Sequence, residues 1–175
     1  MLTEKRIKEA EANVRSYLEH DLLKKTKDKT ALPIFVKNAQ DSLKASKLLL
    51  DNEIPLWAIV SAYYSMFYIS NAVLLHLGYK TGDKIVHKVT SDAVISKVRI
   101  KLKETILESF EEIQEEALKI AEIKSDELAE SLDFERKKRN FIQYQTLKED
   151  IKNKAITSFK RSKEFLYEME ELLNK

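Results

Sequence analysis

The sequence predicts an all-α fold, a bundle of about five to six helices around an uncharged central helix, in which residues 1–175 form a single domain. Three observations favour this prediction. Apolar residues recur at steps of three and four along most of the chain. Only 2 Gly and 2 Pro are present, so few sharp turns can form. Residues 54–79 contain no Asp, Glu, Lys or Arg, although these types make up 34% of the chain. No β-strand is predicted.

Two amphipathic helices are expected before the uncharged run. The first is predicted over about residues 3–29, and the second follows Pro33 and carries its apolar stripe to Leu50. Each stripe has the width of a helix face that packs on a core. The first stripe consists of Ile7, Ala10, Val14, Tyr17 and Leu18, and the second of Phe35, Ala39, Ser42, Leu43, Ser46, Leu49 and Leu50.

The uncharged run predicts a helix over about residues 56–78 that the rest of the protein encloses. About 20 apolar residues can cross a membrane, so length alone also allows a membrane span. Ser, Asn, His and several Tyr within the run favour the buried helix. Pro55 suits its first turn, and Gly78 suits a left-handed cap at its end. Tyr64 and Asn71 are expected to be structural polar groups of this helix, with ligand contact as the alternative for Asn71.

Three further helices are expected after this run. A loop over residues 78–88 contains both Gly, and a helix follows from about Thr90. An acidic helix begins at Glu104 and continues to about Leu132, and the last helix covers about residues 147–173. Their apolar positions repeat with the helical period, so each helix is expected to bury one face against the bundle.

Composition excludes several kinds of functional site. Without Cys, the chain has no thiol nucleophile and no zinc–thiolate site. Two isolated Gly cannot form a phosphate-binding glycine loop. None of the 3 His has a Glu three residues before it, as a ferritin-like di-iron site requires. We therefore expect no metal and no cofactor. The N-terminus lacks the apolar core of a signal peptide, which predicts a cytoplasmic protein.

Charge is strongly segregated in the second half of the chain. Residues 104–135 carry 12 acidic and 2 basic side chains, whereas residues 136–175 carry 6 acidic and 11 basic ones. At the boundary lies a basic cluster, Arg136, Lys137, Lys138 and Arg139, with Phe134, Phe141 and Tyr144 around it. One interpretation is a phosphodiester site, in which Arg139 binds phosphate oxygens and a ring stacks on a base. The other is a helix end whose cations complement the helix dipole, with the aromatic residues in the core.

His87 is the histidine best placed to meet an anion. It lies near the end of the predicted loop, and Lys80, Lys84 and Lys88 are its basic neighbours in the sequence. Cations gathered in this way can attract a phosphate. A lone histidine beside a loop is more often an ordinary solvated side chain, so both interpretations stay open.

Two blocks of the sequence resemble the HEPN family of prokaryotic all-α domains. Residues 62–67, AYYSMF, lead into residues 71–75 and 78–79 and are followed by His87, as in the central helix and loop of that family. Residues 139–144, RNFIQY, lie where the family has an Arg-centred motif before its final helix. The resemblance implies a helical bundle and a homodimer whose paired motifs meet in a cleft. Many such proteins are metal-independent ribonucleases, often toxins neutralised by a minimal nucleotidyltransferase, and others bind nucleic acid or nucleotides without cleaving them.

The sequence departs from the ribonuclease pattern at the position of the base. The family's active form has Arg, usually Asn, and then His four to six residues after the Arg, whereas Arg139 and Asn140 are followed by Ile142, Gln143, Tyr144 and Gln145. A tyrosine, with a pKa of about 10, is a poor base near neutral pH.

We therefore expect a protein that binds RNA or nucleotides without efficient ribonuclease activity, either alone or as one half of a toxin–antitoxin-type pair. Arg136, Lys137, Lys138, Arg139 and His87 are the expected nucleic-acid contacts. One alternative is a metal-independent endoribonuclease that uses Arg139 and Asn140 with Tyr144 or His87. Another is a protein-interaction module that uses the acidic helix and binds no nucleic acid.

The aromatic content of the central helix predicts a homodimer. Trp57, Tyr63, Tyr64, Phe67 and Tyr68 lie within 12 residues and must cover more than one side of a helix. One bundle cannot easily enclose them all, so part of this surface is expected to lie at a two-fold interface.

Overall fold

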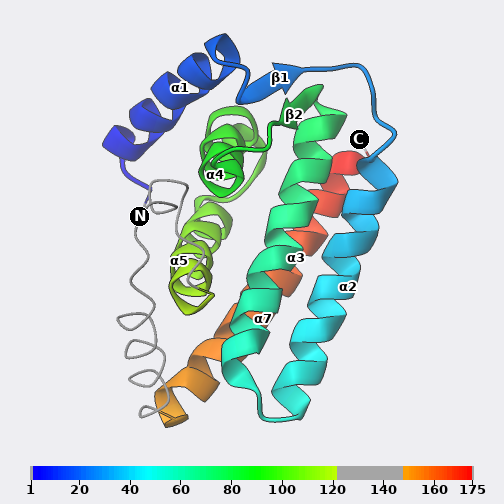
Figure 1. Ribbon diagram of the computed structural model, residues 1–175. Coiled ribbons are helices and arrows are strands. Elements are labelled where there is room, and N and C mark those ends of the chain that lie inside the picture. The colour runs from blue at the N-terminus through cyan, green and yellow to red at the C-terminus, as the bar shows by residue number, and fades with distance from the viewer. Residues whose placement is uncertain (1, 122–147, 175) are drawn as a thin grey trace, which may run out of the picture.

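The structure is a computed structural model that describes residues 2–121 and 148–174 (Figure 1). Its elements are α1 (Glu4–Glu19), β1 (Leu23–Lys25), α2 (Leu32–Asp51), α3 (Pro55–His76), β2 (Tyr79–Thr81), α4 (Val86–Lys97), a 3-10 turn (Arg99–Lys101), α5 (Glu104–Ile120) and α7 (Lys148–Leu173). The described part of the chain thus holds six α-helices and one pair of short strands. The predicted all-α bundle is confirmed.

Helix α3 is the centre of the bundle. It packs along α2 and against α7, and it also contacts α4, α5 and β2 (Figure 1). Helix α1 lies outside this group, where it packs on α4 and contacts β1. The chain therefore surrounds its uncharged helix with amphipathic ones, as the charge pattern predicted.

The burial of α3 agrees with the prediction of an enclosed central helix. Within the described residues, it is the one helix long and apolar enough to cross a membrane by length and composition, and 83% of its most apolar window is buried inside the protein. Pro55 occupies its first turn, where a missing N–H leaves no bond unmade. Gly78 follows its end with φ of 85°, and a Cβ there would lie 3.2 Å from the Thr26 carbonyl oxygen. Gly78 thus serves both the helix end and the close approach of the next segment.

The prediction that no strand forms is wrong. β1 and β2 pair antiparallel, with Leu23 opposite Thr81 and Lys25 opposite Tyr79. The first helix was predicted to reach residue 29, but it ends at Glu19, and Asp21 has a positive φ of 60° that turns the chain into β1. Strands of 3 residues are too short to show an alternating apolar pattern. The pairing of β1 with β2, whose central residues are 56 positions apart, could therefore not be predicted from the sequence.

Helix α4 begins earlier than predicted. It starts at Val86 rather than near Thr90, so His87 lies in its first turn and not beside a loop. Ile85 precedes it with φ of 42°, which is unusual for a β-branched residue. Helix α5 begins at Glu104 as predicted, and its predicted continuation to Leu132 lies outside the described residues. Helix α7 agrees with the prediction over residues 147–173 to within one residue at its start.

Stacked aromatic rings in the core connect α5 and α7 to α3. The rings of Phe110 and Phe165 are 5.1 Å apart between centroids, and Phe110 also stacks on Tyr63 at 6.2 Å. All three side chains are fully buried. Such rings bury large apolar areas, so this column contributes strongly to the position of both outer helices.

Candidate functional site

A hydrogen bond joins the central helix to the start of α4. The Tyr63 hydroxyl lies 2.7 Å from Nδ1 of His87. A second bond ties the same turn to α5, because Nε2 of Gln114 donates to the backbone carbonyl of His87 over 3.1 Å. The imidazole also packs on Phe67, with 4.7 Å between ring centroids. His87, in the first turn of α4, is therefore held by α3 and α5 rather than left in solvent.

Aromatic side chains extend from this point along α3. Rings of Tyr64, Phe67 and Tyr68 contact one another, with centroids 5.6 to 6.1 Å apart, and all three are half-buried. Trp57 lies two turns before Tyr64 on the same side of α3, and it is 50% exposed. We call Trp57, Tyr64, Phe67 and Tyr68 the aromatic face of α3. Because its rings are partly accessible, this face can contact another planar or apolar group.

Burial controls the protonation of the tyrosines in this region. Burial raises the pKa of Tyr63 far above its ordinary value of about 10, the nearby Tyr64 hydroxyl adds to this rise, and the Gln114 amide opposes it. Burial also raises the pKa of Tyr64, and Tyr68 contributes in the same direction. Tyr63 therefore keeps its proton at any physiological pH and acts as a neutral hydroxyl.

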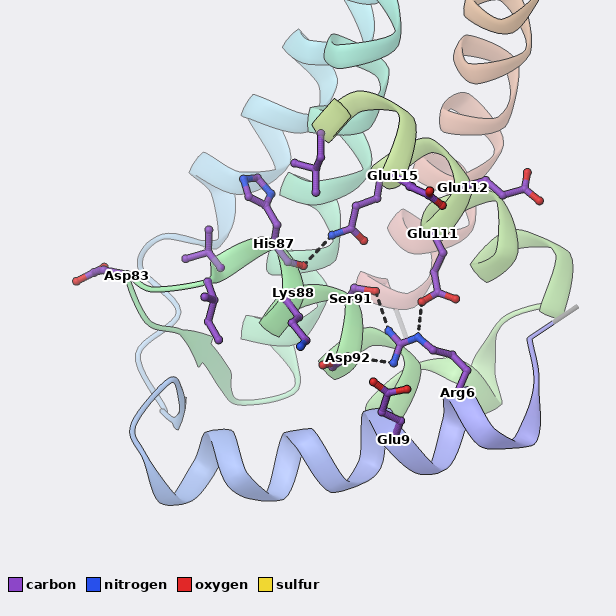
Figure 2. A pocket seen from close by; sticks show the side chains of 14 residues that line it. Arg6, Glu9, Asp83, His87, Lys88, Ser91, Asp92, Glu111, Glu112 and Glu115 are labelled. Carbon is purple, nitrogen blue, oxygen red and sulfur yellow. Dashed lines mark hydrogen bonds and ion pairs between the residues drawn. The ribbon is translucent and has the colours of Figure 1, made fainter. Parts of the chain in front are cut away.

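His87 lines a cavity of about 680 Å³ between α1, α4 and α5 (Figure 2). Its lining includes two cations, Arg6 and Lys88. The carboxylates that line it are Glu9, Asp83, Asp92, Glu111, Glu112 and Glu115. Carboxylates thus outnumber cations six to two in the lining. Glu112 and Glu115 also pair with Arg161 and Lys119 outside it, which leaves a smaller net negative charge for a phosphate entering the cavity.

The floor of the cavity is a buried ionic network centred on Asp92. Asp92 is 0% exposed, pairs with Nη1 of Arg6 at 2.7 Å, and accepts hydrogen bonds from the Tyr17 hydroxyl at 2.8 Å and from Nδ2 of Asn13 at 3.0 Å. Nε of Arg6 also pairs with Glu111 at 2.8 Å, as Figure 2 shows. The network satisfies a carboxylate that would otherwise be costly to bury, and it fastens α1 to α4 and α5.

Asn71 makes several hydrogen bonds inside the bundle. Its amide donates to the Phe67 carbonyl at 2.9 Å, and its oxygen accepts from the Thr81 hydroxyl at 3.0 Å. The Thr90 hydroxyl lies 3.3 Å from the amide nitrogen. With 4% of its surface exposed, Asn71 links α3 to β2 and α4. Tyr64, the other expected structural polar group, contributes mainly its ring to the aromatic face.

The remaining predicted site residues are not placed by the structure. Arg136, Lys137, Lys138, Arg139, Asn140 and Tyr144 lie outside the described residues. Of the expected nucleic-acid contacts, His87 alone lies within the described part, and there it neighbours aromatic rings and a carboxylate-lined cavity. No group of three or more His, Asp and Glu placed to hold a metal ion occurs among residues 2–121 and 148–174.

Sequence reasoning missed Tyr63, Gln114, Asp92 and Arg6. Tyr63 was counted among the aromatic residues of α3 but given no polar role. Asp92 and Arg6 are 86 positions apart, and each alone looks like an ordinary charged residue on an amphipathic helix. The sequence contained one indication that Asp92 is buried. Asp92 lies next to Ala93 and Val94, in the helical turn expected to face the core.

Comparison of the chain with protein-family models and with curated proteins finds no match.

Proposed function

We propose that this protein is an HEPN-like nucleic-acid- or nucleotide-binding protein without efficient ribonuclease activity. The observation that supports it best is the partly accessible aromatic face of α3, with His87 packed at its edge. Aromatic rings bind nucleic-acid bases by stacking, which every base allows.

The charge distribution suggests how such a ligand lies. The cavity that His87 lines is rich in carboxylates, so it repels a phosphate backbone. The basic cluster at residues 136–139 supplies phosphate contacts in this proposal, with Arg139 as the bidentate donor. Bases would then stack on α3 while the backbone follows the cations.

Fluorescence anisotropy with a labelled 12-nucleotide single-stranded RNA tests this arrangement. We expect Tyr64→Ala and Arg139→Ala each to weaken binding by about 10-fold or more, because each loses a stacking ring or a bidentate phosphate contact. Binding of the unchanged protein should weaken steeply as salt is raised.

Two matched variants control this measurement. Tyr167→Ala removes a tyrosine that is 62% exposed on α7, and Lys137→Ala removes a single cation from the basic cluster. Both should stay within about 3-fold of the unchanged protein, because neither loses a stacking or bidentate contact. Equal effects of Arg139→Ala and Lys137→Ala would show that the cluster acts as a general basic patch in which Arg139 has no special role. Salt-independent or absent binding would contradict the proposal itself.

A direct assay distinguishes the proposal from the ribonuclease alternative, in which Arg139 and Asn140 act with Tyr144 or His87. Total RNA incubated with a high concentration of the protein in EDTA should stay intact if the proposal holds. Cleavage that persists in EDTA would instead establish a metal-independent endoribonuclease.

The interaction-module alternative is favoured by one observation, the six carboxylates around the cavity. A surface of this charge attracts cationic segments of proteins. Tight binding of a labelled nine-residue lysine peptide, combined with no binding of RNA, would favour this alternative. Under our proposal, a minimal nucleotidyltransferase is the partner expected for a toxin–antitoxin-type pair, and a cytoplasmic location is expected from the sequence.

The proposal also includes a homodimer. Trp57 is 50% exposed, so one copy does not enclose it, and in this proposal Trp57 lies at the two-fold interface while Tyr64, Phe67 and Tyr68 stay accessible to the ligand. Sedimentation equilibrium at micromolar concentration should give about twice the 20.4 kDa of one chain. Trp57→Glu should shift the mass toward a monomer, because it places a charge in an apolar contact. Ile100→Glu, at a residue 90% exposed on the 3-10 turn, serves as the control and should leave the dimer intact.

A further inference from the structure

We infer that Lys24 of β1 and Lys80 of β2 bind the phosphate backbone of a single-stranded RNA. The inference rests on the proposed function, because it adds a phosphate contact to the RNA whose bases stack on the aromatic face of α3. It starts from the register of the two strands, in which Lys24 lies directly opposite Lys80. A backbone hydrogen bond of 2.9 Å from the Thr26 nitrogen to the Gly78 carbonyl continues this pairing beyond the strands.

Both lysine side chains lie on the same face of the two-stranded sheet. Directly opposite residues of an antiparallel pair share one face, and their Cα atoms are about 4.5 to 5.5 Å apart. Lys24 and Lys80 are both exposed, whereas Leu23, the neighbour of Lys24, is fully buried on the other face. The pair therefore presents two neighbouring ammonium groups to solvent.

Further lysines surround this pair. Residues 21–30 and 79–84, which the strand pairing brings together, contain six lysines and three aspartates, and all six lysines are exposed. We call these six the lysine surface, which consists of Lys24, Lys25, Lys27, Lys29, Lys80 and Lys84. Within residues 2–121 and 148–174, none of them forms an ion pair with a carboxylate. Their ammonium groups are therefore accessible to an anionic ligand.

The three aspartates offset this charge only in part. Oδ1 of Asp28 accepts a hydrogen bond of 2.9 Å from the Thr30 nitrogen, and the bonds from Thr30, helped by the nearby charge of Lys80, lower the pKa of Asp28. Asp83 lines the carboxylate-rich cavity. Six lysines against three aspartates leave a net charge of +3 on these two segments, which attracts a phosphate backbone.

The position of Lys24 opposite Lys80 costs stability in the free protein. Like charges directly opposite each other on a sheet repel, and a sheet of two short strands is only marginally stable. A phosphate backbone relieves this repulsion, because its negative charge lies between the two ammonium groups. The alternative explanation is protective, since lysines on exposed strands prevent pairing with the strands of other chains. The experiment below separates the two explanations.

The surroundings of the pair favour a nucleic-acid backbone over a lipid surface. Membrane-surface binding combines cations with apolar side chains that insert among the lipids. The large apolar side chains that are exposed in the described part of the chain all lie outside residues 21–30 and 79–84. In addition, β2 follows the C-terminal end of α3 (Figure 1), about 12 Å along the helix from Tyr68 of the aromatic face. A strand of 12 nucleotides, at about 3.4 Å per nucleotide, is long enough to reach both.

The test measures the affinity for the 12-nucleotide RNA over a range of salt concentrations. The double variant Lys24→Gln, Lys80→Gln should bind about 10-fold more weakly, and the slope of log K against log salt should become shallower by about 1.4, because each phosphate contact to a single strand contributes about 0.7. Its thermal midpoint should not fall, since the variant loses a repulsion. The double variant Lys24→Arg, Lys80→Arg keeps both charges and should bind like the unchanged protein.

The matched control is the double variant Lys160→Gln, Lys163→Gln, which removes two exposed lysines of α7 and changes the net charge equally. It should bind within about 3-fold of the unchanged protein, with an unchanged slope. Equal effects of the two glutamine variants, or no effect of the variant in the sheet, overturn the inference alone and leave the protective role. If that variant instead loses binding to phosphatidylserine vesicles while RNA binding is unchanged, the lysines contact lipid and the inference is wrong. Failure of the unchanged protein to bind RNA contradicts the proposed function, and the inference with it.

Discussion

Replacing Asp92 with Ala is expected to lower the free energy of unfolding by about 3–5 kcal/mol. Asp92 is fully buried and is shared by Arg6, Tyr17 and Asn13. Removing it leaves the partly buried Arg6 with Glu111 as its remaining ion-pair partner, and it leaves the Tyr17 and Asn13 donors without their acceptor. Such a loss costs far more than an exposed ion pair is worth, because water cannot replace the missing contacts. Urea denaturation followed by circular dichroism would measure the change in midpoint.

The matched control is Asp41→Ala on α2. Asp41 forms an ion pair with Lys37 one turn away, and both side chains are largely exposed, so its loss should leave the urea midpoint almost unchanged. Hydrogen exchange would locate the damage, because α1 depends on this network and its amides should lose protection first. A loss below about 1 kcal/mol in Asp92→Ala would show that the network contributes little to the attachment of α1.

Replacing Phe165 with Ala is expected to cost about 3–5 kcal/mol of stability. Phe165 is fully buried on α7 and stacks on Phe110 of α5, which in turn stacks on Tyr63 of α3. The truncation removes the ring that joins α7 to this column and leaves a cavity between three helices. Because Tyr63 is part of the column, its hydrogen bond to His87 is also expected to be disturbed.

Tyr167→Ala is the control for this change. Tyr167 is two residues away on α7 and 62% exposed, so the same truncation removes little buried surface and should cost less than about 1 kcal/mol. Thermal unfolding of the two variants in parallel gives the comparison. Equal shifts in Tm would mean that the aromatic column does not hold α7 in place.

Helix positions in this protein follow from local sequence. The absence of charge over residues 54–79 identified the central helix, and the repeat of Ala10, Val14 and Tyr17 identified the buried side of α1. Apolar periodicity carries this information because every turn of a packed helix must present the same face to the core. The positions of Pro55 and Gly78 marked the ends of α3 for a similar local reason, since the ring of Pro55 fixes its φ and the missing Cβ of Gly78 permits a positive one.

The candidate site, in contrast, depends on contacts between residues far apart in the chain. His87 looked like a solvated residue until the fold placed it on Tyr63, 24 positions earlier, and Gln114, 27 positions later. Asp92 became a buried anion because α1 brought Arg6, Tyr17 and Asn13 onto it. The sequence by itself determined which segments are helices and which faces are apolar, because these depend on neighbours one turn away. Only the tertiary structure decided which polar side chains meet, because the free energy of a buried charge or hydroxyl depends on the partners that packing brings to it.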